Sequence, residues 1–139
     1  MLRFLRWRHD GKRLIVPVVI YPGRPANLQG VHGRALIDTG STTTGIVGGI
    51  ARALDLARRG KKPMGGIGGE QQVERYLFRI GLDSDGDTND APQFPFVFED
   101  VEGFEMRNGF AFDVLLGMDI LHQCDLTLDR TRTARLTFG

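Results

Sequence analysis

The sequence contains a single cysteine, Cys124, among its 139 residues. One thiol excludes a disulfide within the chain, which fits a reducing compartment. No stretch approaches the roughly 20 apolar residues of a membrane-spanning helix. Arginines interrupt the basic N-terminus at residues 3, 6 and 8, whereas a signal peptide needs an uninterrupted apolar core of about 7–15 residues. These absences predict a protein without a membrane span or signal peptide, located in the cytoplasm.

An excess of charge of either sign is also lacking, because 18 Lys and Arg nearly balance 17 Asp and Glu. The net charge of +1 therefore gives no reason to expect a nucleic-acid partner. Residues 1–8 could form a basic amphipathic anchor on a membrane surface, but a strand that exposes its arginines is favoured. His9, His32 and His122 stand in separate segments without metal-ligand spacing, so we expect no metal and no cofactor.

Glycine, by contrast, is abundant: 19 residues are nearly twice the usual ~7% of a sequence. The glycines gather at turns between short apolar runs, which predicts a mainly β chain with little helix. The length indicates one domain over residues 1–139. A chain of this size buries roughly 70% of its unfolded surface, so it needs neither a disulfide nor a metal to fold.

The predicted elements are short. Asp10-Gly11 suits a tight hairpin turn between the strands on either side of it. Pro17 has no N–H to donate, so its strand should have an edge or a bulge there. The predicted strands are 4–8, 13–21, 31–37, 73–82, 94–98, 125–128 and 135–138, with a helix at 50–56, a polar connector at 58–62, and a strand at 113–121 that breaks at Gly117 into a short helix.

The acidic segment 83–90 suggests a calcium loop as an alternative. An EF-hand loop that starts at Asp83 needs glycine at its sixth position and glutamate at its twelfth. Thr88 and Phe94 occupy these positions. A solvated acidic turn is therefore the favoured interpretation.

Three segments contain the residues on which a function can be argued. The tetrapeptide Asp38-Thr39-Gly40-Ser41 occurs once, directly after an apolar run. A glycine-rich segment follows at 64–69, and Val-Leu-Leu-Gly-Met stands at 114–118. The glycine-rich segment lacks the lysine and the serine or threonine of a phosphate-binding loop. Asp113 and Asp119 flank the third segment and are expected to be turn or cap residues.

In this order, the three segments resemble those of the retropepsin-like aspartic proteases, the single-domain, homodimeric branch of that class. Segment 113–121, with Cys124 close behind, is especially similar to the protease domain of the DNA-damage-inducible type and its bacterial relatives. The resemblance covers residues 13–138 as a core and leaves 1–12 as an N-terminal strand or hairpin extension. It implies a closed β-barrel with one or two short helices, a homodimer, and a peptide or protein substrate.

The resemblance also implies roles for the three segments. The first is the catalytic loop, the second is a flap that covers the substrate, and the third supports the catalytic loop. The implied catalytic residues are Asp38, Thr39, Gly40 and Ser41, the flap residues are Gly65, Gly66, Ile67, Gly68 and Gly69, and the supporting residues are Leu115, Leu116 and Gly117. Ile67 and Val114 are expected to contribute to substrate pockets.

Aspartic protease chemistry needs a base that activates water and an acid that protonates the leaving amide. Two carboxylates about 3 Å apart provide both, because they share one proton. The tetrapeptide that contains Asp38 occurs once in the chain, so a second copy of the chain must supply the other carboxylate. Thr39 is implied to hydrogen-bond across the dimer, and Gly40 to bring its N–H close to the carboxylate. Donation from the Ser41 hydroxyl to the carboxylate would favour its ionised form, which predicts a more acidic pH optimum than in a relative with alanine at this position.

Two classes of function remain open. The favoured one is an aspartic endopeptidase, and the alternative is a catalytically weak dimeric domain of the same fold that binds a peptide or a partner. The intact Asp38 tetrapeptide favours catalysis, since a binding module has little need for it. The last strand, 136–138, or another segment is expected to hold the dimer together.

Overall fold

The computed structural model describes residues 2–23, 29–66, 68–83 and 95–139. Within these ranges the chain forms ten strands and two short helices. In chain order they are β1 (Arg3–Arg8), β2 (Ile15–Pro22), β3 (Val31–Ile37), β4 (Gly45–Val47), α1 (Gly48–Ala53), β5 (Ala57–Gly66), β6 (Gly69–Leu82), β7 (Phe96–Met106), β8 (Val114–Leu116), α2 (Met118–Leu121), β9 (Asp125–Leu128) and β10 (Thr133–Phe138). Neither described helix has the length and apolarity needed to cross a bilayer.

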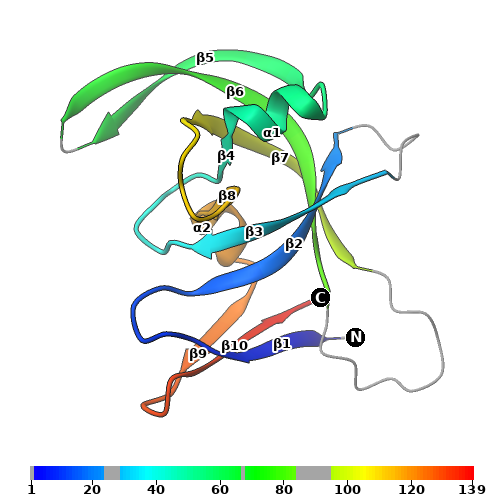
Figure 1. Ribbon diagram of the computed structural model, residues 1–139, viewed down its shortest axis with the longest axis vertical. Coiled ribbons are helices and arrows are strands. Elements are labelled where there is room, and N and C mark those ends of the chain that lie inside the picture. The colour runs from blue at the N-terminus through cyan, green and yellow to red at the C-terminus, as the bar shows by residue number, and fades with distance from the viewer. Residues whose placement is uncertain (1, 24–28, 67, 84–94) are drawn as a thin grey trace.

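A closed barrel forms the centre of the fold (Figure 1). β2 pairs with β3, β3 with β8, β8 with β4, β4 with β7 and β7 with β6, and β6 returns to pair with β2. β5 lies outside this ring and forms a long hairpin with β6. A second sheet, in the order β1-β10-β9, lies below the barrel in Figure 1. The mainly β fold with a closed barrel and two short helices confirms the predicted fold class.

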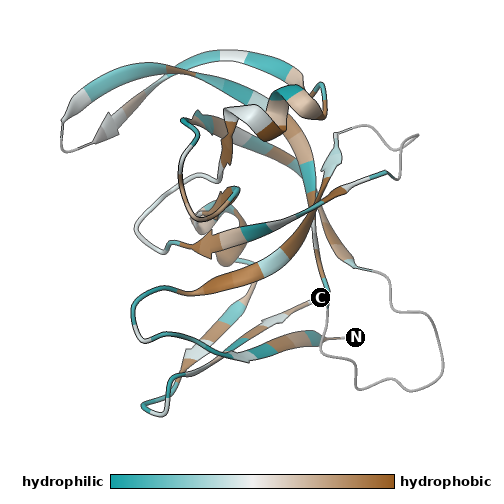
Figure 2. Cartoon of the chain, in the orientation of Figure 1, coloured by the Kyte–Doolittle hydropathy of each residue, from teal (hydrophilic) through white to brown (hydrophobic). Residues whose placement is uncertain are grey.

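The barrel is held together by the large apolar side chains on the inner face of its strands. Phe78, Ile80 and Leu82 alternate along β6, and each is completely buried. Ile20 of β2 and Ile46 of β4 belong to the same core cluster. Figure 2 shows that apolar residues concentrate on the barrel strands, whereas β5 is largely hydrophilic. Removal of this apolar surface from water is the main driving force for closing the barrel.

The two ends of the chain meet in the three-stranded sheet. β1 pairs with β10 along its whole length, and Leu5 packs into the core. The predicted hairpin between residues 4–8 and 13–21 is therefore wrong. The Asp10 carboxylate accepts the N–H groups of Lys12 and Arg13, and Gly11 has a φ of +81°. This wider turn lets β1 pair with the C-terminal strand β10 while β2 pairs within the barrel.

The last strand has no free edge in the part of the chain that the structure describes. β1 pairs with one side of β10 and β9 with the other. Of the two alternatives, 136–138 or another segment, pairing of 136–138 with a partner chain would require one of these two strands to move away. The free edges of this sheet belong to β1 and β9 instead.

The ends of several other elements differ from the predictions. A polar strand at the edge of a sheet, such as β5, shows no apolar periodicity by which the sequence could reveal it. The connector at 58–62 is part of β5, whose side chains are almost all exposed. The helix predicted at 50–56 begins at Gly48 and ends at Ala53. The strand predicted at 94–98 continues to Met106 beyond an irregularity near Asp100, which has a φ of +54°.

Several local predictions are confirmed. The strands at 31–37, 125–128 and 135–138 and the break of 113–121 at Gly117 appear where the sequence placed them. β6 pairs with β2 only from Val19 onward, so β2 has a free edge at Pro17, as expected. Most of the acidic segment 83–90, with its calcium alternative, lies outside the described residues, as does residue 94.

Truncation of Leu136 tests the packing of the terminal sheet on the barrel. Leu136 is completely buried in β10, whereas Leu128 of the neighbouring β9 is 56% exposed. Leu136→Ala should lower the free energy of unfolding by about 2–5 kcal/mol, measured by urea denaturation. Leu128→Ala is the matched control and should change it by only about 0.5 kcal/mol. Equal losses in the two variants would contradict this packing.

The Cys124 thiol gives a second test of the same region. Burial, followed by the nearby Asp125 charge, raises the pKa of the Cys124 thiol from 9.0 to about 11. Its sulfur lies 3.6 Å from the Ile120 carbonyl oxygen. Alkylation by iodoacetamide at pH 8 should therefore be at least about tenfold slower in the native protein than in urea. Because the unfolded chain loses this proton at lower pH, stability should fall as the pH rises from about 9 to 11.

Candidate active site

Asp38 is the first residue after β3. The end of β3 runs parallel to β8, with Ile37 beside Leu116. The Asp38 N–H continues this ladder by donating to the Leu116 carbonyl oxygen at 3.0 Å. Its side chain is half-buried, whereas Thr39 and Gly40 are exposed. Pairing between two strands that are distant in sequence therefore fixes the position of the aspartate backbone.

The loop that follows holds the Asp38 side chain. The Gly40 N–H donates to Asp38 Oδ1 at 2.9 Å, as expected, and the Ser41 N–H donates to the Asp38 carbonyl oxygen at 3.2 Å. A β-carbon on Gly40 would lie 3.2 Å from Oδ1, so a larger residue would push against the carboxylate. The glycine thus allows a tight turn in which a backbone donor orients one carboxylate oxygen.

The Ser41 side chain does not make the predicted contact. Its hydroxyl donates to the Thr43 carbonyl oxygen at 2.7 Å. The hydroxyl has one proton, so this bond withdraws it from the Asp38 carboxylate. The expected donation is therefore wrong for the single chain, and the prediction of a more acidic optimum than in an alanine-bearing relative loses its basis. Ser41 instead fixes the shape of the loop.

The turn after β8 lies directly against this loop. A β-carbon on Gly117 would come within 2.4 Å of the Thr43 carbonyl oxygen and 3.0 Å of the Ser41 carbonyl oxygen. The Met118 N–H donates to the Ser41 carbonyl oxygen at 2.8 Å. Only glycine allows this approach without moving the backbone. The predicted supporting segment and the predicted catalytic loop are thus in direct contact.

A buried hydrogen-bond network joins the same two segments. Thr44 is completely buried, and its hydroxyl donates to Asp119 Oδ1 at 2.7 Å while accepting the Gly117 N–H at 3.2 Å. The Thr44 N–H donates to Asp119 Oδ2 at 3.1 Å, and the Ile120 N–H donates to Oδ1 at 3.0 Å. Asp119 lies in the first turn of α2, whose N-cap residue is Gly117, and it has a structural role, as expected, although it is not the cap itself. Asp113 has a similar role, since it accepts a backbone N–H of β3 at 2.9 Å.

The glycine-rich segment forms the end of the β5–β6 hairpin. Gly66 pairs with Gly69, which has a φ of +102°. A β-carbon on Gly65, Gly68 or Gly69 would have no neighbour within 4 Å, so nothing in the described chain packs against this end. Ile67 lies outside the described residues. In Figure 1 the end of the hairpin and the loop after β3 lie on the same side of the barrel.

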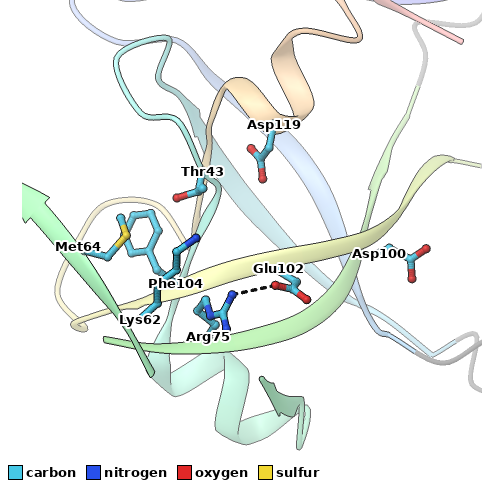
Figure 3. A pocket seen from close by; sticks show the side chains of 8 residues that line it. All are labelled: Thr43, Lys62, Met64, Arg75, Asp100, Glu102, Phe104 and Asp119. Atoms are coloured by element: carbon cyan, nitrogen blue, oxygen red, sulfur yellow. Dashed lines mark hydrogen bonds and ion pairs between the residues drawn. The ribbon is translucent and has the colours of Figure 1, made fainter. Parts of the chain in front are cut away.

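A pocket of about 280 Å³ lies between this hairpin and the Asp38 loop (Figure 3). Its walls come from β5, β6, β7, the loop before β4, and α2. One signal for this pocket is present in the sequence: Lys62 and Met64 are two residues apart on a strand, so they share one face next to the glycine-rich end. The lining residues are Thr43, Lys62, Met64, Arg75, Asp100, Glu102, Phe104 and Asp119.

A half-covered apolar cluster lies beside Asp38 on β3 and β8. Leu36 and Leu115 are partners in the parallel ladder, and both pack against the buried cluster of Val47, Met106 and Phe112. Phe110 stacks on Phe112 at a centroid distance of 5.2 Å and is 46% exposed. Val114, expected to line a substrate pocket, is completely buried in the barrel core. Side chains alternate along β8, so Leu115, not Val114, faces this cluster.

Comparison with known proteins finds similarity in structure but not in sequence. No protein-family model matches the chain. No curated protein sequence matches it either.

Solved structures with the same fold do exist. A retropepsin-like aspartic protease from Rickettsia conorii matches with a TM-score of 0.62 and 12% identity, covering 99% of this chain and 93% of the other. The EIAV protease complexed with the inhibitor HBY-793 matches with a TM-score of 0.51 and 18% identity, covering 84% and 91%. The retroviral protease-like domain of Ddi1 from Leishmania major reaches a TM-score of only 0.40, at 17% identity and coverages of 84% and 82%. The chain has the retropepsin-like fold, which confirms the predicted resemblance at the level of the fold.

Replacement of Thr44 tests the network that braces the loop. Thr44→Val keeps the shape of the side chain but leaves the Asp119 carboxylate and the Gly117 N–H each without one partner. The free energy of unfolding should fall by about 1–3 kcal/mol, measured by urea denaturation. Thr44→Ser retains the hydroxyl and should recover most of the loss. A valine variant as stable as the wild type would show that the network does not stabilise the loop.

Proposed function

We propose that this retropepsin-fold chain is half of an aspartic endopeptidase, with the active site completed by a second copy of the chain. The observation that supports this most directly is the Asp38 carboxylate, oriented by the Gly40 N–H in a braced, partly exposed loop. The barrel and the neighbouring hairpin belong to a fold that this chain shares with an aspartic protease and a retroviral protease of known structure. The single cysteine is consistent with a cytoplasmic location, which is part of the proposal.

The need for a second copy follows from counting available carboxylates. Catalysis without a metal requires two carboxyl groups about 3 Å apart that share a proton. Asp119 is the described acidic residue whose carboxylate binds the Asp38 loop, and both of its oxygens already accept hydrogen bonds. Asp38 of a symmetric partner is therefore the proposed second member, and the exposed Thr39 is the proposed contact between the loops.

The reaction then divides between the two aspartates. The ionised carboxylate takes a proton from water, and the water oxygen attacks the peptide carbonyl carbon. The protonated carboxyl gives its proton to the carbonyl oxygen, which produces a tetrahedral diol. The other carboxyl then passes the proton taken from water to the amide nitrogen, and the first carboxyl recovers a proton from a diol hydroxyl as the carbonyl re-forms. The C–N bond breaks to give a new carboxyl group and a new amine. Atoms and charges balance without a metal or cofactor, and the pair returns to its shared-proton state.

The other predicted site residues surround this chemistry in the proposed function. Gly65, Gly66, Ile67, Gly68 and Gly69 form the flap, which would exclude water when a peptide lies beneath it. Leu115, Leu116 and Gly117 support the catalytic loop. An extended peptide would lie between the hairpin and the loop, and would pair with hairpin backbone. Leu36, Leu115 and Phe110 then offer it an apolar surface beside Asp38.

Replacement of Asp38 tests the enzyme and its alternative, a catalytically weak binding domain. Asp38→Asn should lower the cleavage of a peptide library at pH ~4–7 by about 10²–10⁴-fold or more, because it removes the acid–base group. Asp125→Asn makes the same chemical change on exposed β9 and is the matched control. Peptide binding without cleavage by the wild type would favour the alternative.

Solution mass tests the dimer separately. Specific activity should rise with protein concentration through the dissociation constant of the dimer, and sedimentation should show a dimer over the same range. A stable monomer with full activity at micromolar concentration would exclude the shared site.

A further inference from the structure

The pocket beneath the hairpin contains both paired and unpaired polar groups. Arg75 and Glu102 satisfy each other, with Arg75 Nη1 3.1 Å from Glu102 Oε2. The second oxygen, Oε1, accepts from Arg59 Nε at 3.2 Å. Arg75 Nη2 also donates to the Arg59 carbonyl oxygen at 3.0 Å. The charges of these two lining residues are therefore paired with each other and, for Glu102, also with Arg59.

Asp119 and Asp100 are the other two acidic residues that line the pocket. Both oxygens of Asp119 accept hydrogen bonds from Thr44 and Ile120. Asp100 lies at the far end of the pocket, and its carboxylate points away from the other labelled side chains (Figure 3). Asp119 Oδ1 accepts two of the hydrogen bonds from Thr44 and Ile120 and Oδ2 accepts one, so donors of its own chain hold this carboxylate in place.

Two hydrogen-bond donors in the pocket are unused. The exposed Lys62 side chain has no ion pair or hydrogen bond to any residue that the structure describes. The Thr43 hydroxyl oxygen is buried and has no partner in the described chain. Figure 3 shows the Lys62 ammonium pointing to the side of the pocket where Thr43 lies. Both groups suit an acceptor, and the positive charge of Lys62 favours an anion.

The apolar wall near these donors comes from Met64 and Phe104, both half-buried. An occupant that fits has a short apolar stem that contacts this wall and a terminal group that accepts hydrogen bonds. A volume of about 280 Å³ holds one side chain with several waters, at ~30 Å³ per water. A glutamate side chain has this combination of stem, charge and size.

We propose that this pocket is a specificity subsite that binds a glutamate side chain of the substrate, through an ion pair with Lys62 and a hydrogen bond from Thr43. The inference rests on the proposed function for the path of the peptide. An extended peptide directs every second side chain to the same face. A peptide paired with the hairpin would therefore place one side chain between β5 and the Asp38 loop.

Charge variants of β5 test the subsite. Peptides that differ only by Glu, Gln or Lys, scanned through four positions on each side of the cleaved bond, give kcat/KM for each choice. The wild type should prefer Glu over Gln by about fivefold or more at one position. Lys62→Gln should abolish this preference, and Lys62→Glu should reverse it toward Lys. Thr43→Val should weaken the preference for Glu about two- to fivefold.

Lys61 provides the matched control. It precedes Lys62 on the regular part of β5, so its side chain points to the opposite face. Lys61→Gln removes the same charge and should leave the Glu preference unchanged. Equal effects of the Lys61 and Lys62 variants would overturn the subsite and indicate a general charge effect. A wild-type preference for Lys at this position would also overturn it.

Binding to the Asp38→Asn variant separates the subsite from catalysis. Fluorescence anisotropy with labelled Glu, Gln and Lys peptides requires no cleavage. Selective binding of the Glu peptide that disappears in Asp38→Asn/Lys62→Gln supports the subsite even if the wild type proves inactive. Cleavage by the wild type with no dependence on Lys62 in either assay refutes the subsite and leaves the endopeptidase standing.

Discussion

The contact between the turn after β8 and the loop after β3 is the constraint on which the candidate site depends. Backbone meets backbone there, with no room for a β-carbon on Gly117 against the Thr43 carbonyl oxygen. The Thr44–Asp119 hydrogen bonds lock the same contact from the buried side. A loop held in this way keeps the Asp38 carboxylate in place without burying its charge. Preorganisation of this kind is what an acid–base site requires.

The β5–β6 hairpin is stabilised mainly by backbone hydrogen bonds, whereas the barrel is stabilised by buried apolar side chains. The barrel closes over completely buried side chains, whereas β5 exposes nearly all of its side chains and is held mainly by its ladder to β6. A strand that is not needed for the core leaves one face available for a ligand. Lys62 and Met64 occupy that face, and Arg75 on β6 is already neutralised. The arrangement therefore combines a rigid loop with an open wall of unused hydrogen-bonding groups.

Thr43 belongs to both parts of the site. Its carbonyl oxygen accepts the Ser41 hydroxyl, and its own hydroxyl is buried at the pocket without a partner. An occupant that binds this hydroxyl would contact the segment that shapes the Asp38 loop. In the proposed function, Thr43 would therefore serve both the recognition of a substrate side chain, through its hydroxyl, and the alignment of the carboxylate, through its carbonyl oxygen. A change that widens the contact between Gly117 and the Thr43 carbonyl oxygen would therefore disturb both the pocket and the position of Asp38.

The sequence by itself determined the features that depend on local chemistry. The Asp38 loop, the glycine-rich end of the hairpin and the turn at Gly117 were all predictable, because a tight turn or a close approach restricts which residues fit. Only the tertiary structure decided that β1 pairs with β10, that Leu115 rather than Val114 faces the cluster beside Asp38, and that Ser41 donates to Thr43. It alone brought Lys62 to Thr43, because strands far apart in the chain must first close the barrel. Which strands pair, which side chains face the site and which acceptor a hydroxyl bonds all depend on contacts between distant segments, and a local sequence pattern does not contain this information.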